Sequence, residues 1–105
     1  MSALVITLAG EFDIYNVDTL AASLSPAHEG RDVIIDMRAV RYMDSTALTV
    51  LIRMQKRRVI ANLQPARFAG LTPNLRRLFS LTRLDVVWPI YATLDEALAS
   101  FRVAS

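Results

Sequence analysis

Large apolar residues alternate with smaller or polar ones at the start of the chain, and the spacing of apolar residues then changes. Large apolar residues occupy every second position over residues 4–9, which predicts a strand that ends at Gly10. Residues 33–35 form a short, continuous apolar run between two aspartates. Such a run is typical of a strand that is covered on both faces.

Helical spacing appears twice in the first 61 residues. Residues 17–24 place apolar side chains at i, i+3, i+4 and i+7, which predicts an amphipathic helix with Asn16 as its N-cap and Ser25-Pro26 at its end. A second helix is predicted from Ser45 to Ala61. Its expected buried stripe consists of Leu48, Leu51, Ile52 and Val59.

Shorter signals follow in the second half of the chain. A strand is predicted over residues 67–69, after a break at Gln64-Pro65. Thr72, followed by Pro73, is expected to cap a helix. Val86-Val87 is predicted as the last strand. The segment 93–96 reads Thr-Leu-Asp-Glu, a capping box that opens the final helix.

The order is therefore strand then helix, repeated four times. This alternation predicts an α/β fold, with helices packed on a mostly parallel sheet. A length of 105 residues predicts a single domain over residues 1–105. No segment approaches the roughly 20 apolar residues of a membrane span. The absence of cysteine excludes a disulfide framework and fits a cytoplasmic protein.

The charges are distributed unevenly. Residues 1–52 contain three Arg and seven Asp or Glu, a net −4, whereas residues 53–105 contain nine Lys or Arg and three Asp or Glu, a net +6. Arg53, Lys56 and Arg57 share one face of the predicted helix, without aromatic residues to stack on bases. A solvated helix face is therefore preferred over nucleic-acid binding.

Residues 40–51 carry the most informative motif. Asp44, Ser45 and Thr46 stand at the predicted start of a helix, where unpaired backbone N–H groups carry partial positive charge. A hydroxyl at such a position tolerates an attached phosphate. A plain N-cap is the alternative interpretation of Ser45.

This segment resembles the Met-Asp-Ser-Ser/Thr-Gly-Leu signature of STAS domains of the anti-sigma factor antagonist type. The resemblance covers nearly the whole chain, and further segments similar to family elements follow in the family's order: Gly10–Asp13, Val33–Asp36, Leu75–Phe79 and Asp95–Leu98. The family's Gly after the two hydroxyls is Ala47 here. Arg83 stands where the family often has Gly, and a left-handed backbone there would cost about 1 kcal/mol or more.

The resemblance implies a STAS fold, a small sheet with helices packed mainly on one side. It also implies a regulator rather than an enzyme, with no cofactor. Its unphosphorylated form would bind an anti-sigma factor serine kinase and release a sigma factor. Phosphorylation of Ser45, or of Thr46 as the runner-up, would switch this binding off, and a phosphoprotein phosphatase would reset it. The expected partner-binding residues are Asp13, Asp44, Ser45 and Thr46.

Two alternatives remain open. The chain could be a STAS subunit of a stress-signalling complex or of a lipid-transport ATPase, which the motif does not distinguish. The chain could also be an enzyme that uses Asp44 or Ser45 as a nucleophile. A general acid/base pair of Asp13 and Asp44 is not preferred, because no other residues supply an oxyanion site. His28 is the only histidine and there is no cysteine, so no metal site is expected.

Overall fold

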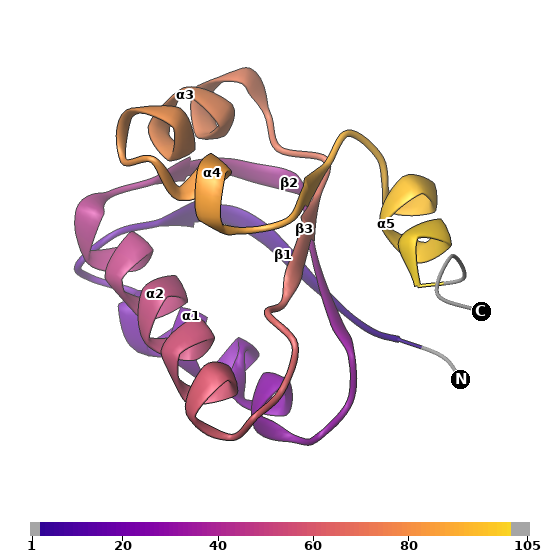
Figure 1. Ribbon diagram of the computed structural model, residues 1–105. Coiled ribbons are helices and arrows are strands. Elements are labelled where there is room, and N and C mark those ends of the chain that lie inside the picture. The colour runs from indigo at the N-terminus through magenta and orange to yellow at the C-terminus, as the bar shows by residue number, and fades with distance from the viewer. Residues whose placement is uncertain (1–2, 102–105) are drawn as a thin grey trace.

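Between residues 3 and 101, parallel strands form one sheet (Figure 1). It has four strands in this part of the chain, and their order follows the sequence, β1-β2-β3-β4. The computed structural model describes residues 3–101. The strands are β1 (Leu4–Phe12), β2 (Val33–Met43), β3 (Arg67–Ala69) and β4 (Ile90–Tyr91). The predicted α/β fold with a parallel sheet is confirmed.

Helices cover the two faces of the sheet unequally. The helical elements are α1 (Val17–Ser23), the 3-10 helix η1 (Ser25–His28), α2 (Ser45–Ile60), α3 (Pro73–Leu81), α4 (Leu84–Val87) and α5 (Leu94–Ser100). Only α5 lies on the opposite face from the other helices (Figure 1). This arrangement confirms the packing expected mainly on one side. Between residues 3 and 101, no helix is long and apolar enough to cross a membrane.

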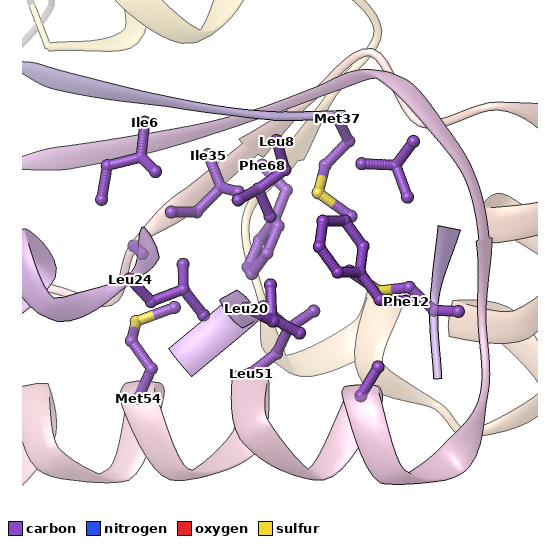
Figure 2. Packing of buried hydrophobic residues seen from close by; sticks show 14 of the residues in the cluster. Ile6, Leu8, Phe12, Leu20, Leu24, Ile35, Met37, Leu51, Met54 and Phe68 are labelled. Atoms are coloured by element: carbon purple, nitrogen blue, oxygen red, sulfur yellow. The ribbon is translucent and has the colours of Figure 1, made fainter. Parts of the chain in front are cut away.

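The main core lies between the sheet and the larger helical layer. Side chains of β1 and β2 meet Leu20 of α1 and Leu51 and Met54 of α2 in this space (Figure 2). A separate, smaller cluster lies under α5 and contains the buried residues Ile34, Ala69 and Ala97. The two clusters explain the continuous apolar run at residues 33–35, because neighbouring side chains of β2 face different helical layers.

Both long strands extend beyond the predicted ends. β1 continues through Gly10, which has a φ of 100°, and the register with β2 shifts on either side of it. β2 continues past Asp36, whose carboxylate accepts the backbone N–H of Arg38 at 3.1 Å beside the first register shift. Bulges of this kind bend a strand without ending it. The extensions carry Phe12 and Met43, which pair in register, to the same edge of the sheet.

The predicted strand at Val86-Val87 is wrong. These residues belong to α4, a single turn in which the Trp88 N–H donates to the Leu84 carbonyl at 2.9 Å. Arg83 precedes this turn with a φ of 61°, so the left-handed backbone considered for it is confirmed. Trp88 is extended, as the residue before a proline prefers, and the strand forms only after Pro89.

The expected burial of Val59 is also wrong, since its side chain is 62% exposed. The buried side of α2 ends instead with Gln55 and Arg58, which are 4% and 1% exposed. The Gln55 side chain accepts the Ala66 N–H at 2.8 Å and donates to the Ala66 carbonyl at 2.9 Å. These polar side chains form hydrogen bonds with backbone N–H and C=O groups of buried loops, which an apolar side chain could not do.

The hydroxyl expected to cap α3 does not do so. Thr72 occupies the N-cap position, but its side chain makes no capping hydrogen bond. Its Oγ1 is buried and has no hydrogen-bond partner within residues 3–101. Pro73 at the first helical position has no N–H that needs a partner, and its fixed φ suits a helix. The start of α3 is therefore set by Pro73 rather than by a capping hydroxyl.

Candidate functional site

The carboxyl ends of β1 and β2 bring two polar segments together at one edge of the sheet. The Asp44 N–H donates to the Phe12 carbonyl at 3.1 Å, so the pairing of the strands continues to their last residues. The loop 13–16 leaves β1 at this point, and α2 begins there after β2. The two segments predicted to form the partner surface are therefore neighbours.

Asp44 connects the loop to the helix through its two carboxylate oxygens. Its Oδ1 accepts the Ala47 N–H at 2.9 Å, and its Oδ2 accepts the Ile14 N–H at 3.0 Å. Asp44 is therefore the N-cap of α2, and Ser45 is the first helical residue rather than the cap. By accepting both N–H groups, this carboxylate holds the loop 13–16 against the start of α2.

The loop 13–16 is ordered by its own side chains. The Asp13 carboxylate accepts the Tyr15 N–H at 2.9 Å, and Asn16 Oδ1 accepts the Asp13 N–H at 2.8 Å. Asn16 Nδ2 donates to the Glu11 carbonyl at 2.7 Å. Asn16 occupies the predicted N-cap position of α1, but its side chain makes no capping hydrogen bond, because its amide is used within the loop. The loop thereby presents Ile14 and Tyr15, which are 62% and 93% exposed.

Ser45 is exposed on the first turn of α2, and Thr46 is half-buried beside it. Both line a groove of about 360 Å³ that runs between α1 and α2. Asp18 and Arg53 also line this groove, on α1 and on the third turn of α2. The Thr49 hydroxyl donates a hydrogen bond to the Ser45 carbonyl at 2.9 Å, so this hydroxyl is used within the helix.

The site is predominantly acidic. Asp13 and Asp44 are half-buried, and Glu11 lies at the base of the loop, 3.7 Å from Arg41 in an exposed ion pair. No group of three or more possible metal-ligating side chains occurs in the part of the chain that the structure describes. His28 lies away from this site in η1, where burial and then the charges of Arg57 and Arg58 lower its pKa.

The STAS domain family matches residues 1–97, so the chain belongs to the STAS domain family. It is similar to the anti-sigma-B factor antagonist of Bacillus subtilis (strain 168), with 35% identity over 88 residues that cover 83% of this chain and 80% of that protein.

Solved structures share the fold. An anti-sigma factor antagonist from Mycobacterium paratuberculosis superposes with a TM-score of 0.78 at 27% identity, over 93% of this chain and 84% of the other. The anti-sigma factor antagonist SpoIIAA, solved in its unphosphorylated form, gives a TM-score of 0.66 at 23% identity, over 94% and 88% of the two chains. The latter likeness concerns the fold alone.

The structure adds residues that the sequence interpretation did not assign to the site. Asn16 holds the loop in place, Ile14 and Tyr15 are exposed at its tip, and Asp18 lines the groove beside Ser45. The Asp-x-x-Asn spacing of residues 13–16 was a usable signal, because such side chains commonly bond to nearby backbone in turns. Nothing in the spacing of Asp18 links it to Ser45.

Proposed function

We propose that this chain is an anti-sigma factor antagonist whose unphosphorylated form binds an anti-sigma factor with serine kinase activity and thereby releases a sigma factor. The observation that carries the proposal is the exposed Ser45 at the first position of a 16-residue helix, directly after the capping Asp44. The names of the curated relatives support the same role. In this role the chain is a ligand and substrate of its partner, and it is not itself an enzyme.

The start of α2 suits a phosphate. Of the first four N–H donors of the helix, that of Asp44 is bonded to the Phe12 carbonyl and that of Ala47 to the Asp44 carboxylate. The donors of Ser45 and Thr46 are the ones nearest to a phosphate on Ser45. Phosphate at a helix N-terminus is electrostatically favourable, so the modification is compatible with the fold.

The same phosphate changes the partner surface. It adds about −1.5 to −2 charge at neutral pH, next to Asp44 and Asp18, and Asp13 lies in the loop that Asp44 binds. A partner that packs closely against this surface, or that carries acidic groups opposite it, would then be repelled. Removal of the phosphate by a phosphoprotein phosphatase would restore binding.

The test is to incubate the purified protein with the anti-sigma factor kinase of its own organism and ATP, and to map the modified residue by mass spectrometry. Phosphate is expected at Ser45, and Ser45→Ala should abolish its incorporation. Thr46→Val tests the adjacent hydroxyl: phosphate should still be found on Ser45 in this variant, whatever effect the loss of a partner contact has on the rate. Phosphate only on Thr46 or at a distant residue would contradict the proposal.

Binding is tested with the phosphate mimic Ser45→Asp. Its affinity for the unmodified kinase should fall at least tenfold, while its melting temperature stays close to that of the wild type, because an anion at a helix N-terminus stabilises by roughly 0.3–1 kcal/mol. A large fall in melting temperature would show that lost packing, rather than surface charge, causes the lost binding.

A further inference from the structure

The groove beside Ser45 continues along α1 and α2 toward the 3-10 helix η1. Its far part has a volume of about 230 Å³ and is lined by Ala21, Leu24, His28, Val50, Arg53, Met54 and Arg57. Three of these residues, Ala21, Val50 and Arg53, also line the part beside Ser45. We call the far part the basic end of the groove, because its charged residues are all cationic.

The cations of the basic end lack a counter-charge. Arg53 and Arg57 are exposed, no acidic residue lines this part of the groove, and within residues 3–101 neither arginine forms an ion pair. They stand four residues apart on α2, a spacing at which like charges repel. Burial and then the charges of Arg57 and Arg58 lower the pKa of His28, so its imidazole lies in a positive potential. An anion at this place would relieve the repulsion.

The lining of the basic end indicates what kind of molecule supplies the anion. Leu24 and Met54 are buried beneath the cations, so a matching occupant carries apolar atoms as well as an acidic group, unlike inorganic phosphate. No aromatic side chain lines this part to stack on a base, which disfavours a nucleotide. A symmetric contact with a second copy would place the same arginines against each other. An acidic segment of a protein partner meets both requirements.

We propose that the basic end binds an acidic segment of the anti-sigma factor kinase, with a carboxylate between Arg53 and Arg57. The inference rests on the function proposed above and adds the chemistry of the partner. Because the two parts of the groove share lining residues, a protein bound over Ser45 also reaches the basic end. The Ser45 end carries Asp18, so the charge changes sign along the groove and fixes the direction in which the segment lies.

The basic end lies beyond the reach of a phosphate on Ser45. Arg53 follows Ser45 by eight residues and Arg57 by twelve, which correspond to about 12 and 18 Å along the helix. Both distances exceed the Debye length of about 8 Å at physiological salt. The two arginines should therefore contribute the same factor to kinase binding in the wild type and in Ser45→Asp.

The first test measures kinase binding by calorimetry, with ADP in place of ATP so that Ser45 stays unmodified. Arg53→Gln with Arg57→Gln should weaken binding roughly fivefold at low salt, as expected for the loss of two exposed ion pairs, and the loss should fade as salt is added. Lys56→Gln with Arg76→Gln is the matched control. It removes the same charge from exposed residues that line other grooves, and it should leave the affinity unchanged.

The second test uses His28, the only histidine of the chain, as a reporter within the basic end. Its titration is followed by nuclear magnetic resonance, with isotope-labelled histidine in this protein and an unlabelled kinase. The pKa of His28 should rise when the kinase binds, because a nearby carboxylate favours the charged imidazole.

The outcomes separate this inference from the proposed function. If the wild type binds the kinase and is phosphorylated on Ser45, but the double arginine variant binds as tightly as the wild type or its control, only the inference about the basic end is overturned. Failure of the wild type to bind the kinase overturns both. An equal rise in the His28 pKa with inorganic phosphate alone, or with increasing concentration of this protein alone, would assign the groove to a small anion or to a second copy and overturn the inference.

Discussion

Arg58 is the buried charge on which the far end of α2 depends. Its guanidinium donates to three backbone carbonyls, those of Ala27 at 2.6 Å, Gln64 at 2.8 Å and Arg31 at 2.9 Å. One side chain thus fastens η1, the loop before β2 and the loop before β3 to the same helix. Burial lowers the pKa of Arg58, and the charge of Asp32 opposes this effect.

Replacing this residue should therefore be costly. Arg58→Met should lower the free energy of unfolding by roughly 2–4 kcal/mol, because three carbonyls lose their donor in a buried place. Arg57→Met, one residue away on the exposed face, should change it by no more than about 0.5 kcal/mol. Urea denaturation of both variants measures the difference, and equal losses would show that Arg58 does not have this role.

Asp36 gives the stability of the protein an acid dependence. It is 2% exposed and accepts hydrogen bonds from Arg38, which hold the pKa of its carboxyl below the usual value. A carboxyl with a lowered folded-state pKa stabilises the fold above its unfolded-state pKa, and this contribution is lost as the pH falls through the folded-state pKa.

The difference in melting temperature between wild type and Asp36→Asn should accordingly shrink as the pH is lowered from 6 to 2. Arg38→Met, which removes the cause of the shift, should show the same convergence with the wild type. Scanning calorimetry across this range measures both variants. A difference that stays constant over the whole range would contradict the role given to the ion pair.

At the scale of elements, the turn between α3 and α4 contains a backbone strain that can be relieved. Arg83 has a φ of 61°, a conformation that costs a non-glycine residue about 1–2 kcal/mol. Arg83→Gly should stabilise the protein by roughly 0.5–1 kcal/mol after the added chain entropy of glycine is subtracted. Arg77→Gly, in the exposed middle of α3, should instead destabilise it by about 1 kcal/mol. Thermal unfolding distinguishes the opposite signs.

The loop 13–16 and the helix α2 can be compared by reversing one charge on each. Asp13→Arg should weaken binding of the anti-sigma factor kinase at least tenfold, whereas Arg57→Glu should have a smaller effect, because Arg57 lies far from Ser45 on the same helix. Asp13→Asn removes the charge but keeps an acceptor for the Tyr15 N–H. It therefore distinguishes the effect of the lost charge from the effect of a changed loop conformation. If Arg57→Glu proves the more damaging change, the kinase binds the face of α2 that carries Arg53, Lys56 and Arg57, and not the loop 13–16.

The elements also show where the sequence was informative. Apolar periodicity located β1, α1 and α2 because each packs one regular face against the main core, and the continuous apolar run located the start of β2 because that strand is covered on both faces. It failed at Val59, which is exposed while the polar residues Gln55 and Arg58 of the same helix are buried. It also failed at Val86-Val87, which remain on the surface. Side-chain hydrogen bonds to distant backbone have no local period, so no pattern along the chain announces them. For the same reason the link from Asp44 to Ile14 became visible only in three dimensions.

For the whole molecule, the two clusters predict unequal local stability. Among residues 3–101, the cluster under α5 has three buried residues, Ile34, Ala69 and Ala97, whereas the main core on the other face is much larger. Amide hydrogens of α5 should therefore exchange much faster than those in the middle of α2, through opening that leaves the rest folded. Native-state hydrogen exchange measures this, and equal protection in both helices would show that the layers unfold together.

The strand order β1-β2-β3-β4 has a consequence for folding of the chain during its synthesis on the ribosome. Because each strand is added beside the one made just before it, no strand has to wait for a later segment to be inserted between it and its neighbour. A nascent chain emerges from its N-terminus. The sheet can therefore grow at one edge in step with translation, and α5, which follows all four strands in the chain, covers the other face of the sheet after they have formed.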